Sequence, residues 1–294
     1  MRLVMGAVGR LPYRWLGPLG ALLGLFVGVV LRIRRAHVTA AMARAGVERP
    51  DRAARRMYVS LGRGLFELLW LSGRPPGEAL GVVIDEASAE RFERALGRGR
   101  GVVVATAHTG NWDLTACAAA AWIGARREAR GEARALHVVT KRLSWRALDR
   151  TWQRLRAERG VGLIDARGAV RRVREALVRG DVVAMMVDQV PERESGVAVL
   201  PFLGAPARHD LAPVTLAARA GAPIVVVLGR RAEDGRHVIE VVDVLEPLAT
   251  REAITEATAR IARALEGFVL AHPDQWLWMH RRWKGHSSRP LPVF

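Results

Sequence analysis

The sequence predicts an α/β protein: one domain with a mostly parallel or mixed sheet flanked by helices. From about Val82 to the end of the chain, short β-like runs alternate with longer helical runs. A chain of 294 residues, of which 50% are hydrophobic, is long enough to bury the core of such a domain. The sequence contains no internal repeat and no low-complexity linker that would divide it. An apolar segment at the N-terminus adds a predicted membrane-anchoring helix.

This N-terminal segment has the composition of a membrane anchor. Residues 1–47 contain no acidic residue but seven arginines, at positions 2, 10, 14, 32, 34, 35 and 44. Residues 15–31 carry no charge, and their number is at the lower limit for a spanning helix. Gly20, Gly24 and Gly28 recur at every fourth position and form a smooth face that another helix can approach closely. We expect residues 1–35 to lie in, or marginally span, the membrane, with residues 36–294 as the main domain; a buried helix of a soluble domain is the alternative.

The other elements are predicted from the spacing of apolar residues. Residues 36–72 are expected to be helical, and Gly73–Gly77 is expected to be a loop because of its glycines and prolines. Strands are expected at Val102–Ala107, Leu136–Thr140, Val182–Val187, Val197–Leu200, Ile224–Leu228 and His237–Val242. Helices are expected at Trp112–Arg126, Trp145–Glu158, Ala169–Arg179, Pro213–Ala220 and Arg251–Leu270.

The first of these strands ends on His108, and Asp113 follows five residues later, where a helix is expected to begin. Residues five apart on an ideal helix point about 140° away from each other. The two side chains therefore meet only if His108 lies in the turn and Asp113 in the first helical turn. A carboxylate that orients an imidazole in this way is what a general base acting on a hydroxyl requires. The alternative is a structural histidine beside a helix-capping aspartate.

Polar residues also end the run Val182–Val187, where Asp188 and Gln189 follow. The carboxyl ends of strands in open α/β sheets usually carry ligands, although a turn-forming aspartate is the alternative. The apolar run from Gly196 to Gly204 suits either a groove for a hydrocarbon chain or ordinary core.

Two cationic clusters complete the candidate site. One predicted helix carries Arg154, Arg156 and Arg159, and composition does not single out one of them. The run Pro273–Lys284 interleaves three tryptophans with cations, which suits a membrane interface or a stacking platform for single-stranded nucleic acid. The alternative is packing at the end of the last helix. We expect His280, in the same run, to be a structural hydrogen-bonding residue.

The chain has a net charge of +17 and a sequence pI of about 11.5. Such a charge favours anionic membranes, phosphorylated glycolipids, an acidic carrier protein or nucleic acid as partners. No zinc-finger spacing or RNA-binding aromatic motif accompanies it, so nucleic acid is the least favoured partner.

Four blocks of the chain resemble the bacterial lipid A biosynthesis acyltransferase family, within the wider lysophospholipid acyltransferase group. The blocks are Thr106–Asp113, Asp188-Gln189 followed by Gly196-Val and Pro201–Pro206, Leu216–Pro223, and Pro273–Lys284. The resemblance implies transfer of a fatty acyl group from an acyl carrier protein or coenzyme A thioester to a hydroxyl of a membrane glycolipid. It also implies a location at the inner membrane, with the catalytic domain on the cytoplasmic face.

The resemblance assigns roles to individual residues. His108 matches the catalytic histidine of the family and Asp113 its paired acid, while Arg156, Asp188, Gln189 and Asn111 are expected to bind substrate. The hydroxyl would attack the thioester directly, because no serine or cysteine nucleophile stands near the motif. No metal and no cofactor is expected.

Two departures from the family pattern leave the acceptor open. The motif acid is Asp113, as in phosphatidylinositol mannoside acyltransferases, whereas many lipid A enzymes have glutamate, and Thr39–Met42 lacks an Asn-Leu pair common in the family. A phosphatidylinositol mannoside or a lysophospholipid is therefore the alternative acceptor. The alternatives of another class are a non-catalytic basic protein that binds membranes or nucleic acid, and a hydrolase that transfers the acyl group to water.

Overall fold

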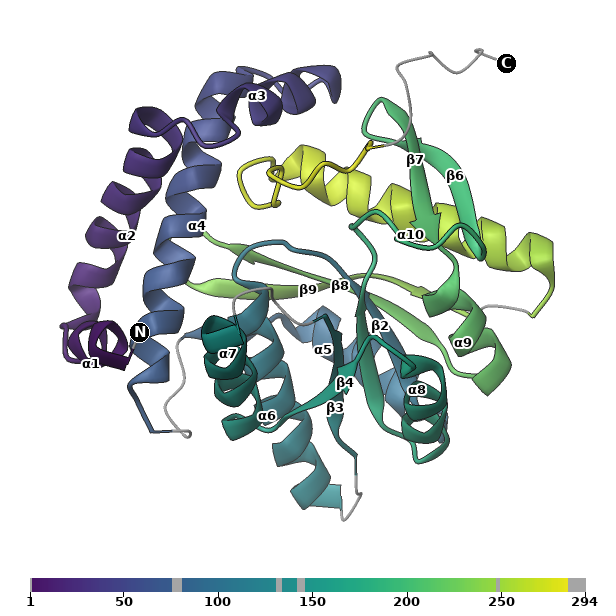
Figure 1. Ribbon diagram of the computed structural model, residues 1–294. Helices are drawn as coiled ribbons and strands as arrows, with labels where there is room; N and C mark the ends of the chain where they lie inside the picture. Colours follow the sequence, from purple (N-terminus) through teal and green to yellow (C-terminus); the bar gives the residue numbers. More distant parts are fainter. Residues whose placement is uncertain (1, 76–80, 131–133, 142–145, 247–248, 285–294) are drawn as a thin grey trace.

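The computed structural model describes residues 2–75, 81–130, 134–141, 146–246 and 249–284. Its centre is a seven-stranded sheet in the order β1-β9-β8-β2-β5-β3-β4 (Figure 1). Neighbouring strands in this sheet are parallel except for the antiparallel pair β8 and β9, and β6 and β7 form a separate hairpin. The strands are β1 (Val82–Ile84), β2 (Val102–Thr106), β3 (Leu136–Thr140), β4 (Val161–Asp165), β5 (Val182–Met186), β6 (Val197–Phe202), β7 (Ala205–Asp210), β8 (Ile224–Arg231) and β9 (His237–Leu245).

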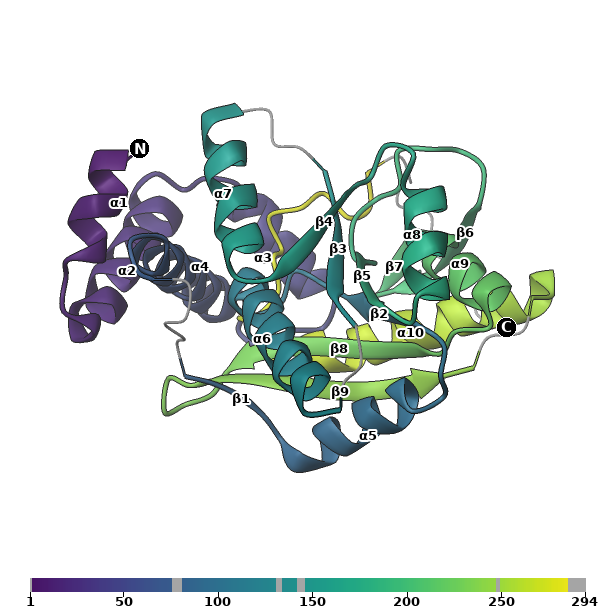
Figure 2. The ribbon, with the colours of Figure 1, turned by 90° about the horizontal axis from the view of Figure 1, so that it is seen from below.

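Helices cover both faces of the sheet, as predicted for this fold class (Figure 2). Side chains alternate between the faces along each central strand. Val102 and Val104 of β2 pack with α5 (Glu86–Leu96) and α6 (Trp112–Arg130). Val103 and Ala105 pack on the other face with α8 (Ala169–Val178), α9 (Ala212–Ala220) and α10 (Arg251–Ala271). The predicted α/β class is therefore confirmed.

The N-terminal helices form a layer beside the sheet. They are α1 (Arg2–Gly9), the short turn η1 (Tyr13–Trp15), α2 (Leu16–Leu25), the π-helical turn η2 (Phe26–Val30), α3 (Arg35–Arg44) and α4 (Pro50–Ser72). In both views α2 lies along α4 (Figures 1 and 2). Among the described residues, one helix, Tyr13–Val30, is long and apolar enough to cross a membrane.

Gly20 and Gly24 of α2 face α4, and the close approach of another helix that the sequence predicted is therefore present. A Cβ atom on Gly24 would lie 2.1 Å from the carbonyl oxygen of Tyr58, and one on Gly20 would lie 2.5 Å from the Cα atom of Arg63. Other residues of the same segment leave large apolar side chains exposed: Leu22, Leu25, Phe26, Val29 and Val30. Because α2 packs on α4, the predicted anchor and the predicted main domain are in contact. The division of the chain into these two parts at residue 35 stays a prediction.

Several elements differ from the prediction. The expected helix 36–72 is two helices, because residues 45–49 are not helical. The strands β1, β4 and β7 and the helix α5 were not predicted. The expected loop Gly73–Gly77 begins where α4 ends, and its last two residues lie outside the described residues, as does the expected start of α7 (Arg146–Glu158) at Trp145.

The glycine contact predicts a clear difference between two alanine variants of α2. Gly24→Ala would force the helix away from α4 and lower the free energy of unfolding by ~1–3 kcal/mol. Gly17→Ala is the matched control, because a Cβ atom at Gly17 would meet nothing within 4 Å. Thermal unfolding in detergent solution measures both variants. Equal midpoints for Gly24→Ala and the unmodified protein would contradict the close packing.

Candidate active site

The ends of two neighbouring strands place His108 next to Asp188. Thr106 of β2 pairs with Met186 of β5 in parallel register, and each of the two site residues follows two positions later. Paired strands lie about 4.8 Å apart, so equivalent residues beyond their ends are within reach of each other. The Nδ1 atom of His108 lies 2.9 Å from Oδ1 of Asp188, and the backbone N–H of His108 donates to Oδ2 at 3.0 Å.

Asp188 is a buried carboxylate held by N–H donors from two parts of the chain. The indole Nε1 of Trp276 donates to its Oδ2 atom at 3.0 Å, in addition to the two donors of His108. Burial alone would raise the pKa of Asp188, but the charge of His108 and the hydrogen bonds from His108 and Trp276 lower it to about 2. Asp188 is therefore ionised at neutral pH.

This contact fixes the imidazole of His108 in one orientation. An ionised carboxylate only accepts hydrogen bonds, so Nδ1 carries a proton and Nε2 keeps its lone pair in the neutral ring. Burial alone would lower the pKa of His108, but the charge and hydrogen bond of Asp188, with the charge of Asp113, raise it above its usual value. The Nε2 atom lies 3.4 Å from Nε2 of Gln189. His108 thus has the orientation of a general base.

The predicted contact between His108 and Asp113 is wrong. Asp113 lies in the first turn of α6, and its carboxylate accepts hydrogen bonds from α7 instead: from Arg156 Nε at 2.6 Å and from Trp152 Nε1 at 2.7 Å. The structure therefore gives the orienting contact to Asp188, and Asp113 acts on the imidazole through its charge. The catalytic role of Asp113 and the substrate-binding role of Asp188 stay predictions.

The ion pair with Asp113 also distinguishes the three arginines of α7. Arg156 is mostly buried and pairs with Asp113. Arg154 pairs with Glu158 at the surface, and Arg159 donates to the carbonyl oxygen of Leu71. Among these three residues, only Arg156 contacts the candidate site.

Asn111 has contacts that are structural in kind. Its Oδ1 atom accepts from the backbone N–H of Leu114, and its Nδ2 atom donates to Glu67 of α4 at 3.1 Å. Glu67 also accepts from Arg231 and contacts His237. Burial alone would raise the pKa of Glu67, but the hydrogen bonds from His237 and Arg231 lower it to about 2. These contacts tie the His108 turn to α4, and the substrate-binding role expected for Asn111 stays a prediction.

Trp276 and Trp278 of the C-terminal run pack behind the site, so for these two residues the packing alternative is correct and the membrane-interface interpretation is wrong. Trp276 and Trp278 are each 1% exposed. The run is bonded to the His108 turn through a bridge between Thr109 and Trp276 and through the N–H of Leu277, which donates to the His108 carbonyl oxygen. Sequence reasoning gave the packing alternative but missed the bond from Trp276 to Asp188.

Burial and hydrogen bonding bear on two other expectations for these regions. Phe202 and Leu203 are fully buried in the core between α4 and α10, so this end of the run from Gly196 to Gly204 is ordinary core. The rest of the run is partly or fully exposed, with Val199 54% exposed, and the hydrocarbon groove considered there stays a prediction. His280 accepts a hydrogen bond from the backbone N–H of Val190, as expected of a structural residue.

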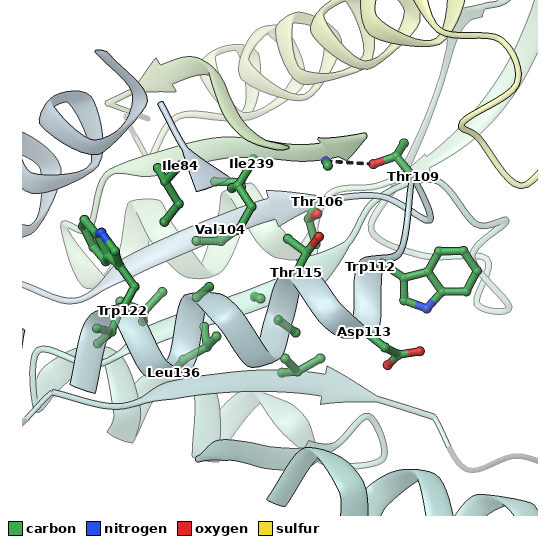
Figure 3. Close-up of a pocket in the computed structure, with 18 of the residues that line it drawn as sticks. Ile84, Val104, Thr106, Thr109, Trp112, Asp113, Thr115, Trp122, Leu136 and Ile239 are labelled. Atoms are coloured by element: carbon green, nitrogen blue, oxygen red, sulfur yellow. Dashed lines mark hydrogen bonds between the residues drawn. The ribbon is translucent and has the colours of Figure 1, made fainter. Parts of the chain in front are cut away.

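An apolar cavity lies between α6 and the sheet (Figure 3). It encloses about 910 Å³ of unfilled space, its mouth included. Thr109, Trp112 and Asp113 lie at one end and Trp122 at the other. Arg156 also lines the cavity, and so do both chain neighbours of His108, although His108 itself does not. The cavity therefore joins a long hydrocarbon-lined space to the polar groups around the base.

The comparisons with known proteins identify the family. The family model described as bacterial lipid A biosynthesis acyltransferase matches residues 2–285. A search of curated proteins gave no match. The match covers nearly the whole chain, including the His108 turn, the Asp188 strand end and the C-terminal tryptophans. We conclude that the chain belongs to the bacterial lipid A biosynthesis acyltransferase family, whose members transfer an acyl group from a donor to a lipid acceptor.

Proposed function

We propose that this acyltransferase moves a fatty acyl chain from an acyl carrier protein or coenzyme A thioester to a hydroxyl of a membrane glycolipid. The observation that carries this proposal is the His108–Asp188 pair, which has the geometry of a general base beside an apolar cavity. The membership of the family supports the reaction class, and the exposed apolar face of α2 supports a membrane location. The inner membrane, with the catalytic domain on its cytoplasmic face, is the proposed location.

The proposed mechanism is direct attack. The acceptor hydroxyl takes the place of the Gln189 amide at Nε2 of His108, which removes the hydroxyl proton as the oxygen attacks the thioester carbonyl. The tetrahedral intermediate expels the thiolate, and the imidazolium returns the proton to the sulfur. Asp188 stabilises the imidazolium throughout, while the Asp113–Arg156 pair fixes the polar end of the cavity.

The cavity is proposed to hold the acyl chain. Asp113 and Trp122 are nine residues apart on α6, which corresponds to ~14 Å along the helix axis. An extended hydrocarbon chain advances roughly 1.25 Å per carbon at the length and angle of C–C bonds. The part of the cavity between Asp113 and Trp122 is therefore long enough for about 11 carbons. The indole of Trp122, which packs edge-on against Phe92, is proposed as the floor that limits chain length.

Replacing His108 tests the reaction. His108→Ala should lower acyl transfer by ~10²–10⁴-fold, because the base is lost. Purified enzyme, a radiolabelled acyl thioester and membrane lipid extract give the measurement as labelled lipid. His137→Gln is a matched control, since His137 also pairs with an aspartate, Asp181, at 3.0 Å but does not itself line the cavity or contact the His108 site.

The outcomes separate the proposed function from its alternatives. Full activity of His108→Ala would contradict the mechanism. Release of free fatty acid without labelled lipid would indicate a hydrolase, and salt-sensitive nucleic-acid binding without thioester consumption would indicate a non-catalytic protein. Mass spectrometry of the membrane lipids of a strain lacking the gene identifies the acceptor. The lipid that lacks an acyl chain there is the acceptor, whether it is a lipid A-type glycolipid, a phosphatidylinositol mannoside or a lysophospholipid.

The raised pKa of His108 predicts the acidic limb of the pH profile. Only the neutral imidazole accepts a proton, so kcat/KM should fall as the pH drops through the pKa of His108, which lies above the usual value. Asp188→Asn removes the carboxylate that raises this pKa, so the limb should move to lower pH. The loss of orientation should also lower kcat by roughly 10⁴-fold, as in other histidine–aspartate pairs. If the acidic limb of the pH profile did not shift in Asp188→Asn, a group other than His108 would control it.

The floor of the cavity predicts a change in chain length. Trp122→Ala should extend the cavity, and each additional methylene that becomes buried is worth ~0.8 kcal/mol, or about fourfold in kcat/KM. Competition between acyl donors of increasing length should therefore show a preference for longer chains. Trp122→Phe retains an aromatic floor and should keep the original preference. If the unmodified enzyme and both Trp122 variants preferred the same acyl chain length, the acyl chain would bind outside this cavity.

A further inference from the structure

A second, polar cavity lies between the N-terminal helices and the turn that joins β8 to β9. It encloses about 1080 Å³ of unfilled space, its mouth included. Its lining residues include Tyr13 and Arg14 of η1, Arg63 of α4, Arg231 at the end of β8 and Arg236 of the turn that follows. None of the residues that line this cavity lines the apolar cavity under α6, so the two are separate sites.

The cavity carries two positive charges that no acidic side chain balances. Two of its four arginines are paired: Arg231 with Glu67, and Arg236 with Asp234. Within the described part of the chain, Arg14 and Arg63 have no ion-pair or hydrogen-bond partner. Arg63 is partly buried, and its Nε atom is a buried donor without an acceptor. Buried donors of this kind are uncommon and call for an acceptor that the protein itself does not supply.

The charge and the hydrogen-bond donors of the site fit a phosphoryl group. A phosphomonoester carries between about −1.5 and −2 charges at pH 7, which matches the two unbalanced arginines. The planar guanidinium group also binds phosphoryl oxygens in a bidentate manner, with short and strong hydrogen bonds. The hydroxyl of Tyr13, in the same lining, is an additional donor.

The position of the cavity indicates where such a group comes from. Its lining includes Tyr13, the first residue of the apolar helix that could cross a membrane, and Gly17 of the next turn. Tyr13 is 48% exposed and Trp15 is 51% exposed. Exposed tyrosine and tryptophan rings at the end of an apolar helix lie at the depth of lipid headgroups. The cavity is therefore at the level of the headgroup layer when α2 lies in a bilayer.

We propose that this cavity binds the phosphoryl headgroup of a membrane lipid, with Arg14 and Arg63 pairing with its oxygens. Binding there holds η1 of the N-terminal layer against α4, which also carries Glu67, the residue bonded to Asn111 in the His108 turn. This proposal does not depend on the acyl transfer reaction, because the cavity is separate from His108 and from the apolar cavity.

The test measures headgroup binding without a bilayer. Dihexanoyl phosphatidic acid, dihexanoyl phosphatidylcholine and inorganic phosphate are titrated calorimetrically into the full-length protein in a non-ionic detergent. The double variant Arg14→Gln/Arg63→Gln is compared with Arg172→Gln/Arg174→Gln, a charge-matched pair of exposed residues on α8. We expect the unmodified protein and the α8 control to bind phosphatidic acid at least tenfold more tightly than phosphatidylcholine, and the Arg14/Arg63 variant to lose this preference.

The outcomes also separate the sources of the phosphoryl group. Competition by inorganic phosphate at millimolar concentration would support the site and show that the phosphate alone is sufficient. Binding that inorganic phosphate does not displace would support the intact lipid as the ligand. Equal affinity of the two double variants for phosphatidic acid would overturn the proposal. Unchanged lipid binding with weaker binding of an acidic acyl carrier protein in the Arg14/Arg63 variant would overturn it in favour of a protein-docking site.

Discussion

The Asp188 carboxylate joins three parts of the chain that are far apart in sequence. It accepts hydrogen bonds from the backbone and the ring of His108, at the end of β2, and from the indole of Trp276, after α10, while it stands itself at the end of β5. A buried carboxylate without such donors would be protonated or would destabilise the fold. The same three hydrogen bonds therefore stabilise the fold at the carboxyl ends of β2 and β5 and set the orientation of the base.

The two acidic residues near His108 have different partners and different effects. Asp188 is in direct contact with the imidazole, whereas Asp113 is neutralised by Arg156 and bonded to Trp152. Because Asp113 lies at the start of α6 and its partners lie on α7, this second pair holds the two helices together at the polar end of the apolar cavity. In the motif that contains both residues, His108 is thus the proposed base, whereas Asp113 fixes the polar end of the cavity.

The sequence predicted the parts of the fold that have strong local patterns. The strands β2, β3 and β5 were predicted within one residue, because each is a run of apolar and β-branched residues next to turn-forming ones. β1 has only three residues and β4 is interrupted by Gly162, so neither showed such a pattern. The partner of His108 was missed for a different reason. Its identity depends on the register between β2 and β5, and one sequence does not contain that information. The sequence indicates the burial of Glu67 only weakly, because Glu67 is a single charge on the apolar side of a long helix.

The contact between α2 and α4 has a consequence for the range of acceptors. Because glycines bring the two backbones into direct contact, α2 cannot change its tilt without moving α4. Glu67 of α4 is bonded through Asn111 to the turn that holds His108, so the base moves with the same unit. On the proposed membrane-bound enzyme, the height of His108 above the bilayer is then constant. The protein would select a hydroxyl by its elevation above the lipid surface as well as by its chemical surroundings.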